Sequence, residues 1–356
     1  MSLSNVTAEF TRDLPKVELH AHLSGSISRQ CLHEIWQRKK AQNPGLAAED
    51  PWVVMPYGKE DYSLTNFFNV YCNSIYHLCN DLPSIAYATH SVLDDFRHDG
   101  VCYLELRTIP RASPDSSFTR EEYLHTILTT IETYRLTHPD LTINLILSID
   151  RANASATAAL AIVDLALAHR ARGIVGIDLC GNPTKGENLA IFAPAFAKAK
   201  AHGLGITLHF AEIDHPPAED ELSVLLGFWP DRLGHVLHVP ERIKEEIVRR
   251  QIGLEVCLSC NVLSQMWEGG FADHPFGHWR GECPVVLCTD DVGFLCSPVS
   301  NEYRLVAEHF HLDRRDILRM ARNAVNLIFG GEEEKSRLRR LLDAFEASHD
   351  DTMIPN

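Results

Sequence analysis

Short apolar segments alternate with longer, helix-like segments along most of the chain. Eight runs of β-branched and other apolar residues, most of them ending in polar residues, are predicted to be strands. They are residues 17–22, 101–107, 142–149, 174–179, 206–211, 232–236, 252–258 and 284–289. Strands that alternate with helices predict a parallel sheet. Eight such repeats predict an α/β fold closed into a (β/α)8 TIM-type barrel.

Several of the intervening segments carry signals that end helices. Residues 154–172 are rich in Ala and Leu and contain no Pro or Gly before Gly173. Three further predicted helices, 121–138, 189–202 and 241–251, end near Pro139, Gly203 and Gly253.

The crossover after the first strand is much longer than the others. It is predicted to contain helices at 26–40, 64–79 and 83–99 and a Pro- and Gly-bearing loop at 42–62. A helical insertion of this kind above a barrel mouth often forms a lid. Extra C-terminal helices after Asn301 complete the predicted shell. With neither a linker nor an internal repeat in the sequence, residues 1–356 are expected to form one domain.

Composition and charge narrow the possible partners. The chain has 356 residues, of which 45% are hydrophobic, so it can bury a large core. Its net charge of −15 argues against nucleic acids and anionic membranes, because binding to phosphates needs a basic surface. The apolar runs are shorter than the roughly 18 residues of a membrane span, and residues 1–11 are polar. We expect a cytoplasmic monomer that acts on a small molecule.

The ten cysteines are scattered and lie mostly in apolar runs, so buried free thiols are expected. Cys257 and Cys260 form a single CxxC pair. Because the sequence has no second pair, zinc-ribbon and cytidine-deaminase-type sites lose support.

The first predicted strand carries two histidines on one face. Side chains alternate across a strand, so His20 and His22 point to the same side while Val17, Leu19 and Ala21 point to the other. Two neutral imidazoles suit zinc. An isolated pair is equally often exposed or hydrogen-bonded to other groups, so a metal site requires further ligands.

Three more predicted strands end in residues that supply such ligands. His209 and Glu212 end the fifth, His235 the sixth, and Asp290 and Asp291 the eighth. The active site of a barrel lies at the C-terminal ends of its strands, so we expect these side chains to meet.

The expected metal site combines three histidines with one aspartate. His20, His22, His209 and Asp290 would hold zinc and leave one position for water, whose pKa falls toward about 7. Glu212 and His235 remain as acid–base groups, and Asp291 is placed to orient hydroxide or substrate. The predicted reaction class is metal-assisted hydrolysis.

Four segments carry a resemblance to a known family. LPKVELHAHLSGSI, TLHFAEI, DRLGHVL and LCTDD resemble the signatures of the metal-dependent adenosine/AMP deaminase family of the amidohydrolase superfamily, in the same order and over nearly the whole chain. VELHAHLSGSIS, YLELRTIPR, IDLCGNPT and CLSCNVLSQ most resemble its adenosine deaminase-like branch, which removes methylamine from 6-methylamino-AMP. The resemblance implies zinc-dependent deamination at carbon 6 of a purine nucleotide, giving IMP and methylamine.

The resemblance also implies a role for individual residues. The zinc ligands of the family match the same three histidines and Asp290. Glu212 matches the acid that protonates the purine ring nitrogen beside the attacked carbon. His235 matches the residue that orients the attacking hydroxide and can shuttle its proton. Asp291 matches the carboxylate that holds the imidazole-side nitrogen of the purine, and Gly181 matches a backbone N–H donor to the base.

One departure from the adenosine deaminases bears on the substrate. Those enzymes have an Asp after HxHL that takes the ribose 5′-hydroxyl, and this chain has Ser24. An Asp would repel a 5′-phosphate, whereas Ser would not. Ser26 is expected to cap the next helix, whose N-terminus favours an anion. Ser24 and Ser26 are therefore expected to cradle a phosphate.

Other candidates near the substrate have ordinary alternatives. His77, Arg107 and Arg111 are possible further phosphate donors, but His77 also fits a helix surface, and both arginines fit ion pairs or the barrel rim. Apolar candidates beside the purine 6-substituent are Phe67, Phe68 and Tyr71, for which core packing is the alternative. Cys260 occupies a position that is usually small and polar in the family.

The sequence is compatible with several competing functions. An adenosine or adenine deaminase would use the same chemistry. Phosphotriesterase-like chemistry would usually need two metals and a bridging lysine, and the sequence offers no candidate for that lysine. A non-catalytic nucleoside-binding protein on the same scaffold would be expected to have lost Glu212 or a zinc ligand, and all are present.

Overall fold

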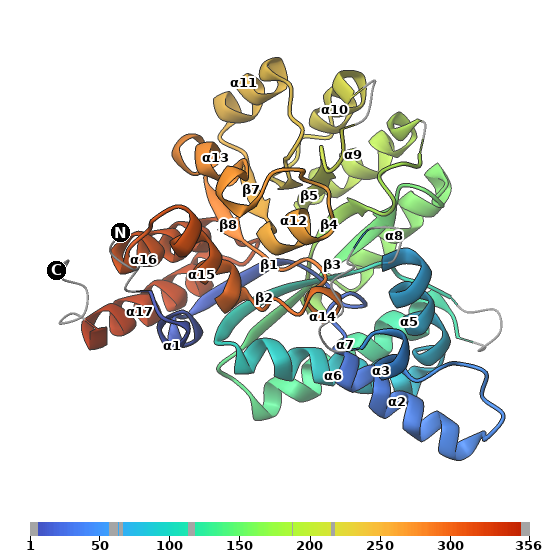
Figure 1. The fold of residues 1–356 in the computed structure, drawn as a ribbon. Coiled ribbons are helices and arrows are strands. Elements are labelled where there is room, and N and C mark those ends of the chain that lie inside the picture. The colour runs from blue at the N-terminus through green and yellow to red at the C-terminus, as the bar shows by residue number, and fades with distance from the viewer. Residues whose placement is uncertain are drawn as a thin grey trace.

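The computed structural model is a barrel of eight parallel strands that pair in chain order (Figure 1). It describes residues 6–56, 63, 67–112, 118–186, 188–214 and 218–349. The strands are β1 (Lys16–His22), β2 (Val101–Thr108), β3 (Thr142–Asp150), β4 (Ile174–Cys180), β5 (Gly205–Phe210), β6 (Arg232–His235), β7 (Gly253–Val256) and β8 (Val285–Leu287). A bridge between Ala21 and Asp290 joins β1 to the segment after β8. The predicted barrel is confirmed.

Helices cover the outside of the sheet. Those that follow β2 to β6 are α7 (Arg120–Thr137), α8 (Ala156–Ala168) with η2 (Arg170–Arg172), η3 (Leu189–Phe192) with α9 (Ala193–Ala201), α10 (Ala218–Leu226) and α11 (Glu241–Arg250). Between β7 and β8 lie α12 (Leu258–Leu263), η4 (Phe271–Asp273) and α13 (Phe276–Glu282). Local sequence sets several ends: Thr119 and Glu122 form a capping box at α7, and Ser155 caps α8.

The first crossover contains α2 (Arg29–Gln42), α3 (Pro51–Val54), the π-helix η1 (Phe67–Cys72), α5 (Asn73–Leu78) and α6 (Leu82–His98). Figure 1 shows α2, α3, α5 and α6 gathered at the lower right, beside the barrel. The expectation of a loop throughout 42–62 was wrong at α3, because Asp50 caps a short helix that has Pro51 in its first turn.

Helices follow β8, and those that extend beyond Asn301 are the predicted extra helices. The helices after β8 are α14 (Val292–Leu295), α15 (Val299–His309), α16 (Arg314–Ala324), η5 (Val325–Leu327) and α17 (Glu332–His349). The N-terminal helix α1 (Ala8–Asp13) packs among them, with the Phe10 ring 5.3 Å from that of Phe345, edge to face. The first and last described helices, α1 and α17, therefore lie on one side of the barrel, at the left of Figure 1.

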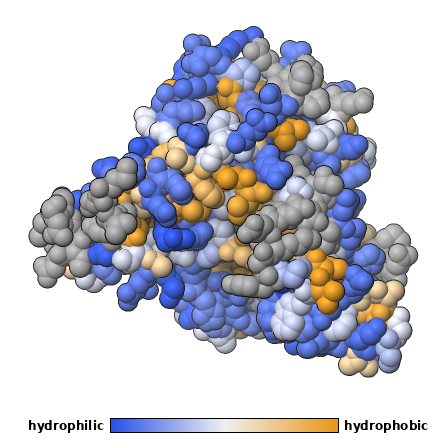
Figure 2. All heavy atoms as spheres, in the orientation of Figure 1, coloured by the Kyte–Doolittle hydropathy of each residue, from blue (hydrophilic) through white to orange (hydrophobic). Residues whose placement is uncertain are grey.

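The face seen in Figure 2 is mostly hydrophilic. Hydrophobic side chains gather in small patches at the centre of the view and at its lower right, over the region of α3 and α5. Trp52 and Val53 on α3 and Tyr76 on α5 are among the exposed large hydrophobic residues. None of the helices within the described ranges is long and apolar enough to cross a membrane.

The interior of the barrel holds a buried network of charged side chains. The Arg107 guanidinium lies 2.8 Å from Glu255 and 3.3 Å from Asp178. Arg232 pairs with the other oxygen of Glu255 and, at 2.6 Å, with Glu105. All five side chains are almost completely buried. Removing charges from water costs several kcal/mol per ion, so the network is tolerable only because its members are paired.

Candidate active site

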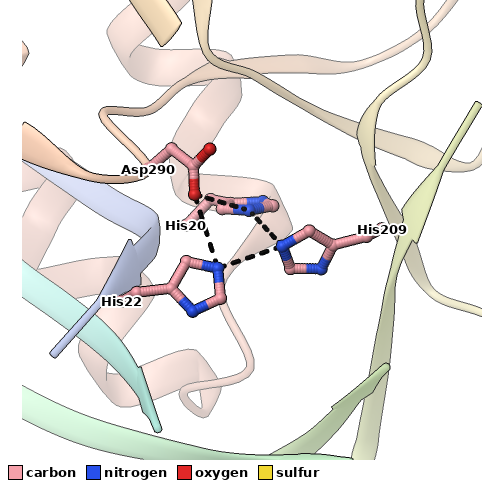
Figure 3. Close-up of side chains that lie close together, drawn as sticks. All are labelled: His20, His22, His209 and Asp290. Carbon is pink, nitrogen blue, oxygen red and sulfur yellow. Dashed lines mark hydrogen bonds and ion pairs between the residues drawn. The ribbon is translucent and has the colours of Figure 1, made fainter. Parts of the chain in front are cut away.

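Three imidazoles and one carboxylate converge at the C-terminal mouth of the barrel (Figure 3). His209 Nε2 lies 3.2 Å from His20 Nε2 and 3.0 Å from His22 Nε2. Asp290 Oδ1 lies 3.6 Å from the first of these β1 histidines and 3.4 Å from the second. These four residues, called the His–Asp cluster below, are the four that the sequence predicted as metal ligands.

The His–Asp cluster fits a single zinc ion. Zinc bonds of about 2.0–2.1 Å in a tetrahedral arrangement separate the ligand atoms by roughly 3.3 Å. The observed separations of 3.0–3.6 Å bracket that value. The donor set of three imidazole nitrogens and one carboxylate oxygen is also one that zinc accepts.

Neighbouring carboxylates orient two of the imidazoles. His20 Nδ1 lies 2.6 Å from Glu255, and His209 Nδ1 lies 3.1 Å from Asp178. A carboxylate at Nδ1 holds the proton on that nitrogen and leaves the Nε2 lone pair for a metal. Because Arg107 bridges Glu255 and Asp178, the network inside the barrel is continuous with the His–Asp cluster.

The protonation of these groups reflects burial and their carboxylate partners. Burial lowers the pKa of His20 and of His22 well below the usual value. Burial would also lower the pKa of His209, but the Asp178 carboxylate raises it to about 9 in the metal-free protein. Although burial opposes ionisation of Asp178, His209 and Arg107 hold the pKa of that carboxyl well below its usual range. A cation among the three Nε2 atoms would replace the proton on His209.

Unusual backbone conformations shape the strand ends beside the cluster. Ala211, His235, Val236 and Asp290 have φ values between 51° and 68°. Non-glycine residues in this region cost of order 1–3 kcal/mol each and persist where the surroundings hold them. Backbone bonds hold Asp290 in place: its N–H donates to the His20 carbonyl, and its carbonyl accepts from the His22 N–H.

Glu212 and His235 lie beside the His–Asp cluster. Ligating atoms of Glu212, His235 and His209 all lie within 4.8 Å of one another. Burial raises the pKa of Glu212 to about 7, so this carboxyl can hold a proton near neutral pH. Burial lowers the pKa of His235 well below its usual value, which keeps the ring neutral.

The Asp291 carboxylate lies against Gly25, next in the chain to Asp290 of the His–Asp cluster. A Cβ atom at Gly25 would lie 1.5 Å from Asp291 Oδ1, so any larger residue would displace the carboxylate. Burial and the neighbouring Asp290 raise the pKa of Asp291 well above its usual value. Gly25 and Asp291 are thus packed together at the start of the chain segments that leave β1 and β8.

The helix α12 brings further side chains to the cluster. Cys260 Sγ donates to Asp290 Oδ2 at 2.9 Å, which leaves Oδ1 facing the histidines. Asn261 lies 2.9 Å from His235 Nδ1. Buried Glu302 accepts from the Ser259 N–H and hydroxyl and holds the first turn of α12.

The structure separates the two serines proposed for the phosphate. Ser24 is exposed and lines a cavity that also touches His22 and Arg111. Ser26 is buried and lines a different hollow, beside Arg29 and Trp52. The expectation that Ser26 caps the next helix was wrong. The turn after β1 uses the Ser26 N–H to bond the His22 carbonyl, and Ser28 caps α2 two residues later.

The further phosphate donors also differ in their placement. Arg107 is buried inside the barrel and engaged by Glu255, Asp178 and the Leu19 carbonyl, so its assignment as a phosphate donor was wrong. Its position on β2 turns the side chain inward, toward charges that require a cation.

The two remaining donors lie on the rim. Arg111 lines the Ser24 cavity, where it donates to the Cys79 carbonyl and lies over the Tyr76 ring. His77 is exposed on α5, bonds the Asn73 carbonyl of its own helix and does not line the Ser24 cavity.

Two other sequence candidates can be placed. Gly181 follows β4 with a φ of 105°, and a Cβ there would lie 2.5 Å from Asp150 Oδ1. The Phe67 ring packs 5.3 Å from that of Phe294, edge to face. The side chains of Phe68 and Tyr71 lie outside the described part of the chain.

The sequence did not reveal which residues orient the ligands and His235. Asp178 and Glu255 lie within the buried strands β4 and β7, and Asn261 and Cys260 lie on α12. A signal for the two carboxylates was present, because IDLC and GLEV each place an acidic residue in an otherwise apolar strand. An acidic residue in such a position is rarely buried without a partner.

Comparisons with known proteins point to one family. A family model described as adenosine deaminase matches residues 15–345. The N6-methyl-AMP deaminase of Bos taurus is 34% identical, with 93% of this chain and 94% of that protein covered.

Solved structures from Arabidopsis show the same fold. A crystal structure of the N6-mAMP deaminase gives a TM-score of 0.86 at 32% identity, covering 94% of this chain and 99% of the other. A complex of Arabidopsis ADAL with IMP gives 0.87 at 31% identity, covering 96% and 99%.

Proposed function

Because the chain belongs to the adenosine deaminase family, we propose that it is a zinc-dependent aminohydrolase acting on a 6-substituted purine nucleotide. The proposed reaction converts 6-methylamino-AMP and water into IMP and methylamine. The observation that carries the proposal is the convergence of the His–Asp cluster with Glu212 and His235 at one end of the barrel. The similarity to N6-methyl-AMP deaminases over 93% of the chain supports the choice of substrate.

Zinc would be held by His20, His22, His209 and Asp290. When bound, it would acidify a water molecule and so supply a nucleophile at neutral pH. Glu255 and Asp178 would keep the His20 and His209 rings oriented toward it.

The remaining groups act on the purine. Glu212, which can hold a proton near neutral pH, donates it to the ring nitrogen beside carbon 6 and so draws electrons away from that carbon. His235 turns Nε2 toward the attacking oxygen. Asp291 holds the imidazole-side nitrogen, and the Gly181 N–H donates to the base. Carbon 6 gains the oxygen, the bond from carbon 6 to the amine nitrogen breaks, and this nitrogen leaves as methylamine with a proton that the attacking water gave up.

The 5′-phosphate is proposed to bind on the rim formed by Ser24 and Arg111. Both residues line one cavity that reaches His22 of the cluster, so a nucleotide could span the two regions. The absence of an acidic side chain at residue 24 avoids repulsion, and the Arg111 guanidinium supplies a positive charge.

The proposal also covers domain organisation, oligomeric state and cellular location. We propose that residues 1–356 form one hydrolase domain that works as a monomer in the cytoplasm. Ten free cysteines, seven of them buried, are typical of a reducing compartment.

A panel of four substrates tests the function. Rates are compared for adenosine, AMP, 6-methylamino-adenosine and 6-methylamino-AMP, each with and without a zinc chelator. We expect 6-methylamino-AMP to give the highest kcat/KM and the chelator to abolish turnover. Preference for adenosine would favour a nucleoside deaminase instead, and failure to turn over any purine would favour a binding protein.

A single substitution tests the proposed acid. Glu212→Gln should retain zinc and bind IMP, but its kcat should fall by about 10²–10⁴-fold, the usual contribution of a general acid. Glu245→Gln, at an exposed position on α11, is the control and should keep the wild-type rate. Near-normal kcat in Glu212→Gln would assign the proton to another group.

A further inference from the structure

A chain of buried hydrogen bonds runs from α13 to His235. The Phe276 N–H lies 3.0 Å from His274 Nδ1, His274 Nε2 lies 3.1 Å from Asn261 Oδ1, and Asn261 Nδ2 lies 2.9 Å from His235 Nδ1. His274, Asn261 and His235 are each at most 2% exposed. Water therefore has little access to these bonds, and their donor and acceptor roles must be satisfied internally.

The backbone fixes the direction of every bond in this chain. A backbone N–H can only donate, so His274 Nδ1 accepts and the proton of the neutral ring lies on Nε2. Burial lowers the pKa of His274 to about 3, which keeps the ring neutral. His274 Nε2–H then donates to Asn261 Oδ1.

The orientation of the Asn261 amide then determines which nitrogen of His235 accepts a hydrogen bond. With its oxygen toward His274, the amide turns its NH2 group toward His235, and an NH2 group only donates. His235 Nδ1 therefore accepts, and the proton of its neutral ring lies on Nε2. A flipped amide would bring two donors together at His274, which a buried site does not tolerate.

His235 Nε2 is directed at the mouth of the barrel. Among the described residues, none accepts a hydrogen bond from this buried nitrogen. The nearest carboxylate oxygen among the described residues is Asp290 Oδ2 at 3.9 Å, beyond hydrogen-bond distance. A protonated Nε2 without a protein partner implies that its acceptor arrives with the substrate or the water.

We propose that His274 and Asn261 are positioning residues that fix His235 in the tautomer with its proton on Nε2. His235 then donates a hydrogen bond to the attacking oxygen and does not serve as the initial base. This inference rests on the proposed function for the identity of the acceptor, but the tautomer itself does not depend on the substrate.

The test combines tautomer detection with a matched pair of variants. The zinc-loaded protein is labelled with ¹⁵N-histidine, and the His235 signals are assigned among the 19 histidines by their loss in His235→Gln. We expect an unprotonated Nδ1 and a protonated Nε2. A proton on Nδ1 would overturn the proposed tautomer. This result needs only the wild-type protein and the His235→Gln variant used for assignment.

The two variants separate hydrogen bonding from packing. His274→Gln can keep a donor toward Asn261 Oδ1, whereas His274→Phe cannot. In the Phe variant, we expect His235 to populate both tautomers and kcat to fall by about 10–100-fold, as for other residues that orient site histidines. KM and zinc content should not change. The Gln variant should restore both the tautomer and kcat. Equal kcat and equal spectra in the two variants would overturn the proposal.

The same data distinguish this inference from the proposed function. If the tautomer is as expected but no purine nucleotide is turned over, the positioning of His235 is supported and the proposed substrate is wrong. If 6-methylamino-AMP is turned over and the proton lies on Nδ1, the proposed function is supported and the positioning of His235 is wrong.

Discussion

The floor of the barrel mouth and the rim above it are built by different means. On the floor, the ligand groups come from strand ends and are held by partners on neighbouring strands, as His20 is by Glu255 and His209 by Asp178. On the rim, Ser24 is exposed and His77 bonds only its own helix in the contacts described. The floor, which is the His–Asp cluster, is held in place by the strands of the sheet. The rim consists of Ser24, His77 and Arg111, and its side-chain positions depend on how the first crossover packs against the barrel.

This difference explains why the chemistry and the substrate are separable in this fold. The His–Asp cluster can be preserved by the barrel while the crossover changes what lies above it. Preorganised groups on rigid elements serve catalysis, and loops and insertions serve specificity. Substitutions on the floor should therefore affect metal, turnover or stability, and those on the rim should affect the choice of substrate.

The largest effect is expected from removing a metal ligand on the floor. His209→Ala should lose zinc and fall to background activity, because three ligands cannot hold the ion as well as four. Zinc is measured per chain, with about one expected in the wild type. His90→Ala, an exposed position on α6, is the control. Full zinc occupancy in a His20→Ala, His22→Ala double variant would contradict the ligand assignment.

The next effect is expected beneath the cluster. Arg107→Met removes the cation between Glu255 and Asp178, which leaves buried negative charge without its partner. Breaking a buried pair costs about 3–5 kcal/mol. The free energy of unfolding is measured by denaturant titration. Arg97→Met breaks an exposed pair with Asp140 and should cost no more than about 1 kcal/mol. Similar losses of unfolding free energy in both variants would show that the buried ion pairs of Arg107 stabilise the protein no more than an exposed pair does.

A smaller effect is expected on the rim, and it should change specificity. Ser24→Asp places a negative charge near a phosphate that carries nearly two charges. At a contact distance near 4 Å, each pair of charges costs about 1 kcal/mol in a water-like medium, so after screening we expect roughly a tenfold effect.

The readout is a ratio of two specificity constants. The ratio of kcat/KM for 6-methylamino-AMP over 6-methylamino-adenosine should fall in Ser24→Asp, while zinc content stays the same. A wild-type ratio near one, or a ratio that the substitution does not change, would mean that Ser24 does not sense the phosphate.

The smallest effect compares two rim residues that the sequence treated alike. Arg111→Met should raise KM for the nucleotide by about fivefold, which corresponds to about 1 kcal/mol for a partly exposed charged contact. His77→Ala should leave KM within experimental error, because His77 does not line the Ser24 cavity. A larger effect from His77 than from Arg111 would mean that the rim binds the phosphate elsewhere.

The sequence predicted the floor well because parallel sheets impose simple rules. The eight strands lie within two residues of the predicted bounds at either end. Alternation placed His20 and His22 on one face, and the common polarity of the strands placed His209 and Asp290 beside them. These relations depend on local periodicity and on chain direction, both of which can be read from the sequence.

The rim was predicted less well because its geometry is not periodic. Ser26 looked like a helix cap, but a turn closed by the Ser26 N–H and the His22 carbonyl delays the helix until Arg29. Arg107 looked available for a phosphate, but the barrel turned it toward Glu255 and Asp178. Neither outcome follows from neighbouring residues in the sequence.

The sequence by itself determined the strand order, the identity of the residues at the strand ends and hence the class of chemistry that they can perform. Tertiary structure decided which partners orient those residues. The link from His274 through Asn261 to His235 joins the segment between η4 and α13, the helix α12 and the end of β6. Such a link depends on distances of about 3 Å between side chains far apart in the chain, a condition that only the packed structure can satisfy.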